Sequence, residues 1–283
     1  MLDFSLQKKL HATNGEMLLQ VACKFDTGKF YCLYGPSGAG KTSVLRMLGG
    51  LMQPDDGMIT MNDTVWFDAH KRINIPPQQR KIGFVFQDYA LFPNMNVREN
   101  ITFALNKNAE KKFIDELLSI TGLTMFASRK IHALSGGQQQ RLALARAIAT
   151  KPSLLLLDEP LSAIDSEMRM QLQTTLLEVH NRFGLTTVLV SHDMDEIIRL
   201  SDHIIHLDHG IIQQYATPAV FFMNGNATTL RGNIISIEKE NTISVLINNR
   251  LIKINTSSGD EKFNQGDEVE IQYSNAALII RKL

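Results

Sequence analysis

The residues most suited to chemistry form a loop of small residues that ends in a lysine and a threonine. Residues 35–42 match the P-loop pattern G-x-x-x-x-G-K-S/T in full. Glycines in such a loop let backbone N–H groups converge on phosphate oxygens at the positive end of the following helix. Lys41 is expected to reach the β- and γ-phosphates, and Thr42 to ligate Mg²⁺. The predicted nucleotide contacts are Gly35, Pro36, Ser37, Gly38, Ala39, Gly40, Lys41, Thr42 and Ser43.

A second segment ends a run of leucines in two carboxylates. Leu154–Leu157 has the composition of a buried strand, and Asp158 and Glu159 follow it. Taken alone, this pattern is that of a strand meeting solvent. Beside a P-loop it predicts a metal and water site, with Asp158 in the Mg²⁺ shell and Glu159 as the general base for an attacking water.

A third segment is predicted to begin another helix, whose N-terminus could accept an anion. Leu134–Gln138 reads Leu-Ser-Gly-Gly-Gln and precedes a helical pattern, with Ser135 in the N-cap position. One nucleotide cannot use two helix starts of one chain unless the fold brings them together, whereas a two-fold dimer places each opposite its partner's P-loop. The sequence therefore predicts two composite sites in a homodimer. The second half of each site would consist of Ser135, Gly136, Gly137 and Gln138.

The elements that position these segments alternate between apolar runs and amphipathic stretches. Strands are predicted at 30–34, 82–86, 154–157 and 186–190. Helices are predicted at 41–51, 111–123, 139–150 and 166–183. This alternation is typical of a parallel α/β sheet.

Beyond residue 224 the pattern changes to short β-type runs. They lie at 232–237, 242–247, 250–254, 268–273 and 277–280, with a hairpin expected at 248–249. We therefore expect an α/β nucleotide-binding domain at 1–224 and a small all-β domain at 225–283, with an OB-like, partly open barrel.

Composition restricts the remaining possibilities. The formal net charge is zero, which gives no bias toward nucleic acid or other polyanions. Cys23 and Cys32 are expected to flank a strand hairpin, and two thiols provide neither a metal spacing nor a disulfide framework, which favours a reducing cytosol. The chain shows no signal-peptide layout and no apolar run near the ~18 residues that span a bilayer, so partners must supply any membrane role.

In combination, these motifs resemble those of the ABC ATPase family, whose signature is LSGGQ and whose nucleotides lie between two subunits. Gln87, after the strand at 82–86, resembles the Q-loop residue that senses Mg²⁺ and water. Residues 162–165 resemble the D-loop, with Ile164 in place of the usual leucine and Asp165 expected to bridge the dimer. His192 resembles the switch histidine that contacts the γ-phosphate. The resemblance covers roughly residues 2–224 and implies a P-loop ATPase domain with a helical subdomain.

The resemblance also implies cofactors and partners. They are ATP, Mg²⁺, a second copy of the chain, membrane permease subunits and, indirectly, a substrate-binding protein, at the cytoplasmic face of the inner membrane. Residues 88–100 resemble an importer segment in which Leu91, Phe92 and Met95 either line a permease groove or pack internally. Family members often stack adenine on an aromatic residue near the N-terminus. Only His11 stands near that position, so the base contact is left unassigned.

The cargo is predicted from two further runs. Residues 75–88 and 269–278 resemble those of molybdate importer ATPases, which implies a molybdate- or tungstate-type oxyanion and a TOBE- or Mop-like final domain. Residues 227–283 are short for paired oxyanion-binding modules. Sulfate, ferric iron, polyamine and sugar importers stay as alternatives. A soluble ABC ATPase would carry twin domains, a coiled coil or zinc cysteines, and an inactive regulator would lack Glu159 or His192.

Overall fold

The computed structural model describes residues 1–12, 15–105, 111–161, 166–223, 230–238, 242–247, 250–255, 263–274 and 277–282. The chain divides into two compact units, Met1–Tyr215 and Ala216–Leu283. The domain boundary predicted at 224–225, the hairpin at 248–249 and the D-loop at 162–165 lie outside the described residues. Within the described ranges, no helix has the length and apolar character needed to cross a membrane.

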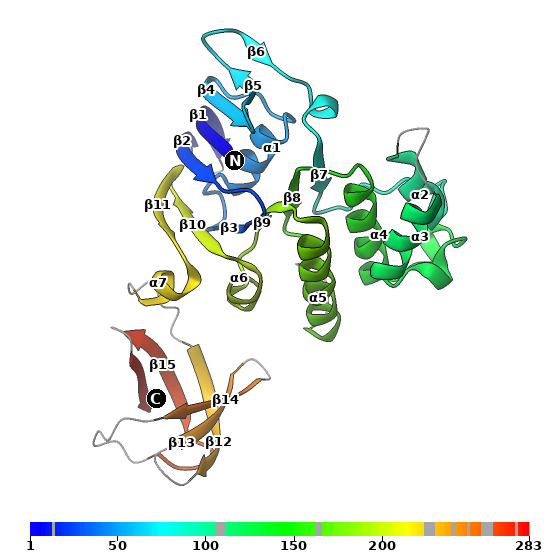
Figure 1. Ribbon diagram of the computed structural model, residues 1–283. Coiled ribbons are helices and arrows are strands. Elements are labelled where there is room, and N and C mark those ends of the chain that lie inside the picture. The colour runs from blue at the N-terminus through cyan, green and yellow to red at the C-terminus, as the bar shows by residue number, and fades with distance from the viewer. Residues whose placement is uncertain are drawn as a thin grey trace. The chain divides into compact units, whose positions relative to one another are not determined.

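The first unit is built on an 11-stranded mixed sheet with the order β6-β5-β4-β1-β2-β11-β10-β3-β9-β8-β7 (Figure 1). Its strands are β1 (Leu2–Ala12), β2 (Gly15–Phe25), β3 (Phe30–Tyr34), β4 (Asp56–Met61), β5 (Thr64–Asp68), β6 (Ile73–Asn74), β7 (Ile82–Val85), β8 (Leu154–Asp158), β9 (Thr186–Val190), β10 (His203–Asp208) and β11 (Ile211–Ala216).

The parallel half of this sheet confirms the predicted α/β core. The four predicted strands are β3, β9, β8 and β7, adjacent in that order and paired in parallel. Every residue of β8 and β9 is buried, as expected for strands covered on both faces. Because parallel strands end at one edge of a sheet, the residues that follow these four strands lie along the same edge.

The antiparallel half was not predicted. In it, β1 pairs with β2 and β4, β4 with β5, and β5 with β6. The hairpin expected between Cys23 and Cys32 is wrong, since Cys23 lies in β2, Cys32 lies in β3, and β11 and β10 separate these strands. Both cysteines are free thiols.

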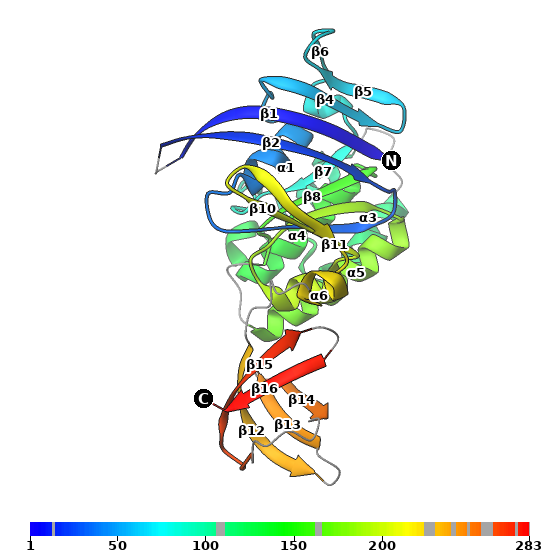
Figure 2. The same cartoon turned by 90° about the vertical axis from the view of Figure 1, so that its left-hand side faces the viewer.

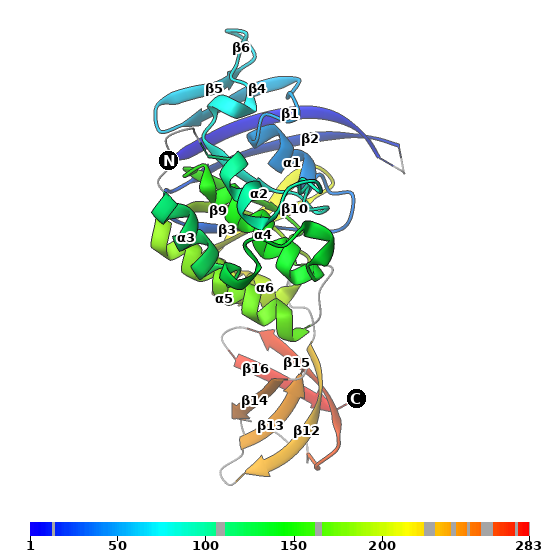
Figure 3. The ribbon, with the colours of Figure 1, turned by 90° about the vertical axis from the view of Figure 1, so that its right-hand side faces the viewer.

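Helices cover the parallel strands, as Figure 3 shows for α3 to α6. They are α1 (Lys41–Leu48), α2 (Val97–Phe103), α3 (Lys111–Ile120), α4 (Gly136–Ala149), α5 (Ser166–Phe183) and α6 (Met194–Leu200). Alternate residues of β8 face two different cores. Leu154 and Leu156 pack in the core that includes α1, whereas Leu155 and Leu157 pack in the core that includes α3, α4 and α5. The strand that ends in Asp158 is therefore held from both faces.

The second unit is a five-stranded antiparallel sheet preceded by α7 (Pro218–Met223) (Figure 2). Its order is β14-β13-β12-β15-β16, with the strands β12 (Leu230–Glu238), β13 (Thr242–Ile247), β14 (Arg250–Asn255), β15 (Glu268–Ser274) and β16 (Ala277–Lys282). Each predicted β-type run lies within one of these strands. Ile234, Ile243, Val245 and Val269 form the buried core.

A buried arginine anchors the helix that follows the P-loop. Arg80 is only 1% exposed, and its guanidinium donates to the carbonyls of Met47, Leu48 and Ile75 at 2.9, 3.0 and 2.8 Å. Met47 and Leu48 are the last residues of α1, whose carbonyls have no partner within the helix and carry its negative partial charge. Burial lowers the pKa of Arg80 to about 10, well above neutrality. Arg80 therefore caps α1 as a cation.

Replacing this cap should destabilise the first unit. We expect Arg80→Met to lower the free energy of unfolding by about 2–4 kcal/mol, because the carbonyls of Met47, Leu48 and Ile75 each lose a buried, charged donor. Urea titration followed by the fluorescence of Trp66, the only tryptophan, measures this change. The control is Arg98→Met, which removes an exposed ion pair with Asp115 and should cost less than about 1 kcal/mol. Equal losses in the two variants would refute the capping role.

Candidate functional site

The P-loop joins β3 to α1 and requires glycine at two close approaches. Gly35 has φ of 151°, and a Cβ there would lie 1.9 Å from the carbonyl oxygen of Leu207 in β10. Gly40 has φ of 101°, and a Cβ there would lie 2.5 Å from a methyl carbon of Leu19 in β2. A side chain at Gly35 would collide with backbone, and at Gly40 the left-handed φ would strain any other residue, so both positions favour glycine.

A cleft of about 650 Å³ opens over this loop, within the ~300–1,000 Å³ usual for small-molecule sites. Three lysines line it, which suits a polyphosphate ligand. Its lining consists of Lys8, Lys9, Leu10, His11, Met17, Ser37, Gly38, Gly40, Lys41, Thr42, Ser43, Met52 and Glu159. The apolar side chains of β1 and β2 were missed in the sequence because they lie far from the motif. They place an apolar surface beside His11, the one predicted candidate for a base contact.

Lys41 and Asp158 are both buried and both disfavoured in their charged forms. Lys41 is 7% exposed and donates through Nζ to the carbonyls of Gly35 and Pro36, both at 2.8 Å. Burial lowers the pKa of Lys41, although the nearby carboxylate of Glu159 opposes that change. Burial likewise raises the pKa of Asp158. A polyphosphate beside Lys41 and a cation beside Asp158 would each favour the charged form.

The predicted metal ligands Thr42 and Asp158 are in contact, since the Thr42 hydroxyl donates to Asp158 Oδ1 at 2.8 Å. Hydroxyl and carboxylate oxygens suit Mg²⁺, which usually takes one or two protein ligands and completes its shell with phosphates and water. The described residues contain no group of three or more His, Cys, Asp or Glu side chains that would form an all-protein metal site. This donor set therefore fits a Mg²⁺ ion that arrives with a nucleotide.

Glu159 and His192 meet at the ends of β8 and β9. The Glu159 carboxylate lines the cleft, and its Oε1 lies 3.7 Å from His192 Nδ1. The backbone of Glu159 has φ of 46°, a left-handed conformation that costs a non-glycine residue about 1–2 kcal/mol. Its N–H donates to the carbonyl of Val190 at 3.2 Å. The structure thus holds the predicted base in a strained turn against β9.

A network on both sides of His192 was not predicted. The Ser191 hydroxyl donates to Glu196 Oε2 at 2.6 Å and accepts from the N–H of Asp193 at 3.0 Å. Arg169 in α5 donates to Asp193 Oδ2 at 2.7 Å, and its Nε lies 3.8 Å from Glu196 Oε1. The side chain of His192 itself is 65% exposed. The residues before and after the histidine are held by hydrogen bonds. His192 itself lines a separate pocket of about 40 Å³ that shares Glu159 with the cleft.

One local signal for this network exists in the sequence. Asp193 caps α6 by accepting from the N–H of Glu196, and an acidic N-cap with Glu three residues later marks a helix start. Glu196 is 4% exposed, and burial raises the pKa of its carboxyl group. The approach of Arg169 from another helix has no signature in the sequence.

The remaining predicted residues are not brought to the cleft. Ser135 and Gln138 form a capping box at the start of α4, and among the described residues that line the cleft none comes from 135–138. Gln87 is exposed beyond the end of β7 and is also absent from that lining. Asp165 lies outside the described residues. One chain therefore provides the P-loop half of the predicted nucleotide site. Its other anion-accepting helix start, at α4, does not line the cleft.

The segment expected either to line a permease groove or to pack internally is half-buried. Leu91, Phe92 and Met95 are all partly exposed, and Leu91 packs against the core around α3 to α5. The Phe92 ring lies 4.5 Å from the ring of Phe103, which is 60% exposed. This partial exposure is compatible with a permease groove and with internal packing.

Comparisons with known proteins agree with this geometry. The family profile described as ABC transporter matches residues 18–162. Over 270 residues the chain is 37% identical to the spermidine/putrescine import ATP-binding protein PotA of Fusobacterium nucleatum, covering 90% of this chain and 70% of the relative. It is 43% identical over 196 residues to PotA of Marinobacter nauticus, covering 68% of this chain and 51% of the relative. The chain thus spans about half the length of the second relative.

Among solved structures, the chain resembles the dimeric ATP-binding cassette MJ0796, described as a post-hydrolysis state bound to ADP and Pi. The TM-score is 0.66 at 29% identity, covering 77% of this chain and 99% of the cassette. The relatives favour the polyamine alternative over the molybdate-type cargo expected from residues 75–88 and 269–278. Family profile, relatives and site geometry agree, and the chain belongs to the ABC transporter family as one of its ATPases.

Proposed function

We propose that the chain is the ATP-hydrolysing subunit of an importer, and that two copies bind two Mg·ATP between them. The observation that carries the proposal is the separation of two anion-accepting helix starts. The cleft holds Lys41, Thr42 and Glu159, whereas the capping box of Ser135 and Gln138 begins α4 outside it. In a two-fold dimer each α4 start lies opposite the partner's P-loop. The MJ0796 cassette, described as dimeric and bound to ADP and Pi, supports a nucleotide-binding dimer.

In this proposal the P-loop binds the phosphates. The backbone of residues 35–40 and the start of α1 accept the phosphates, and Lys41 exchanges two carbonyl contacts for the β- and γ-phosphate oxygens. Thr42 and Asp158 hold Mg²⁺, with Gln87 as a further ligand implied by the family resemblance. When bound there, Mg²⁺ would neutralise charge on the phosphates. Lys41 stabilises the charge that develops on the transferred group.

In this proposal Glu159 and His192, which follow β8 and β9, carry out hydrolysis. Glu159 orients and polarises the attacking water, and its place in the cleft beside Lys41 supports that role. His192 contacts the γ-phosphate from the turn fixed by Ser191, Asp193 and Arg169. The family resemblance assigns Asp165 to the dimer interface.

Import of a spermidine/putrescine-type polyamine is the cargo reading that the relatives support. The ATPase contacts permease subunits rather than cargo, and a substrate-binding protein delivers the cargo on the far side of the membrane. We place the chain at the cytoplasmic face, with Leu91, Phe92 and Met95 near the permease contact. The five-stranded C-terminal sheet is OB-like in this proposal.

Removing the charge of the proposed base should separate binding from hydrolysis. We expect Glu159→Gln to bind ATP normally, to hydrolyse it about 10²–10⁴-fold more slowly, and to persist as a dimer with Mg·ATP. Phosphate release and light scattering after size exclusion measure these properties. The control Glu178→Gln alters an exposed carboxylate of α5 and should behave as the unsubstituted chain. Unchanged turnover in Glu159→Gln would remove Glu159 from its role.

The network behind His192 predicts a selective loss of turnover. Glu196→Gln keeps an acceptor for Ser191 but loses the charge that faces Arg169. We expect kcat to fall about tenfold, equivalent to about 1.4 kcal/mol, with the KM for ATP changed less than twofold. Steady-state phosphate release measures both constants. Asp195→Asn removes a neighbouring charge on α6 as a control. Equal effects in both variants would contradict the positioning role.

The cargo proposal is tested with the complete transporter. We expect ATPase activity in liposomes that contain the chain, its permease and its binding protein to rise with spermidine or putrescine. Molybdate, tungstate, sulfate and ferric iron serve as comparisons. Stimulation by one of these instead would overturn the polyamine cargo and leave the importer ATPase standing. No stimulation by any cargo would count against import itself.

A further inference from the structure

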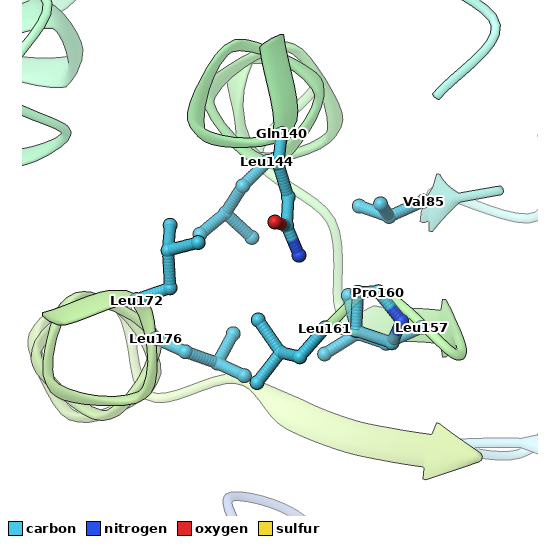
Figure 4. A pocket seen from close by; sticks show the side chains of 8 residues that line it. All are labelled: Val85, Gln140, Leu144, Leu157, Pro160, Leu161, Leu172 and Leu176. Atoms are coloured by element: carbon cyan, nitrogen blue, oxygen red, sulfur yellow. The ribbon is translucent and has the colours of Figure 1, made fainter. Parts of the chain in front are cut away.

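A small, partly open cavity lies where α4, α5 and the ends of β7 and β8 meet. Its volume is about 20 Å³, enough for one water molecule, which needs about 10–15 Å³. Seven of its lining residues are apolar and one is an amide, as Figure 4 shows. They are Val85, Leu144, Leu157, Pro160, Leu161, Leu172, Leu176 and Gln140.

The amide of Gln140 is unusual for this position. Gln140 is 3% exposed, and its Oε1 and Nε2 have no hydrogen-bond partner within the described part of the chain. Figure 4 shows the side chain pointing from α4 into the cavity. A buried polar group without a partner costs about 1–3 kcal/mol, so a leucine of similar size would stabilise this fold better. The stability of the isolated chain therefore gives no reason for an amide here.

The lining residues connect three segments of the proposed site. Val85 ends β7 two residues before Gln87. Leu157 and Pro160 flank the Asp158-Glu159 pair. Gln140 lies on α4 two residues beyond Gln138 of the capping box. Because α4 is one continuous helix, any displacement of its first turn against a partner's nucleotide also moves the amide of Gln140.

A second local cost lies beside the cavity. The backbone of Glu159 is held at φ of 46°, and Pro160, the next residue, lines the cavity. Strained residues of this kind persist only where their surroundings hold them, and they cluster at active sites, ligand clamps and switch regions. Pro160 and Leu161 line the same cavity as Gln140, so the backbone of this turn is the candidate partner for the buried amide.

We propose that Gln140 is a positioning residue for ATP hydrolysis. When Mg·ATP is bound, its amide hydrogen-bonds to the backbone of the Glu159–Leu161 turn, directly or through one water in the cavity. That bond fixes the Glu159 carboxylate toward the attacking water and links the start of α4 to the catalytic turn. The inference rests on the proposed role of Glu159 and adds a residue that touches neither nucleotide nor metal.

The test compares Gln140→Leu and Gln140→Met with the unsubstituted full-length chain. Both variants keep the cavity filled and remove the amide. We expect the Tm to be unchanged or higher, the KM for ATP to stay within twofold, and kcat to fall at least tenfold. Leu172→Met is the matched control, because it conserves volume at the same cavity and keeps the amide. Its kcat should stay within twofold of the unsubstituted chain.

The outcomes separate this inference from the proposed function. A kcat within twofold of the unsubstituted value in a folded Gln140 variant would overturn the positioning role. A lower Tm together with a lower kcat and a higher KM for ATP would show that the Gln140 amide is structural. Failure of both variants to fold would show the same. Either result would also overturn the positioning role. If the unsubstituted chain hydrolyses no ATP, the proposed function itself fails, and the inference fails with it.

Discussion

The site depends on one hydrogen bond, from the Thr42 hydroxyl to the carboxylate of Asp158. It joins residues 116 positions apart and forms only if β3, β9 and β8 lie side by side in parallel. That order places the P-loop, the carboxylate pair and His192 after three neighbouring strands. Arg80 fixes the far end of α1, and alternate leucines of β8 hold its strand from both faces. These buried residues thereby fix the positions of the P-loop and of the carboxylates that follow β8.

The same burial makes the site unfavourable without its ligands. Desolvation lowers the pKa of Lys41 and raises that of Asp158, and Glu159 stands in a left-handed backbone conformation. The buried Gln140 amide, which has no hydrogen-bond partner among the described residues, is a fourth unfavourable feature. It lies in the cavity that Pro160 also lines. A nucleotide with its metal supplies charges that favour the ionised lysine and aspartate. Binding energy is therefore available to shift the catalytic turn, and in our account this shift couples nucleotide binding to closure of the dimer.

Local patterns were enough to predict the P-loop, the carboxylate pair, the parallel strands and the C-terminal β region, because each depends on short-range spacing. The antiparallel strands β1 and β2 were missed although they pair as a hairpin that closes at Ala12 and Gly15 and the burial of β2 alternates, both of which are local signals. The pairing of β1 with β4 joins distant segments and has no such local signal. Contacts made across elements, such as those of Arg80, Arg169 and Gln140, leave no signature in the sequence. The oxyanion cargo was preferred on short resemblances, yet the described cleft, which we propose binds the nucleotide, carries no information about cargo.

The central claim is that each nucleotide lies between the P-loop of one chain and the α4 start of another. The most direct measurement is thiol crosslinking of a chain that carries Ser37→Cys and Ser135→Cys, with the unsubstituted chain, whose Cys23 is half-buried and Cys32 buried, as reference. A covalent dimer that forms only with Mg·ATP is the predicted result. Crosslinks confined within single chains, or a yield unaffected by Mg·ATP, would contradict the composite site.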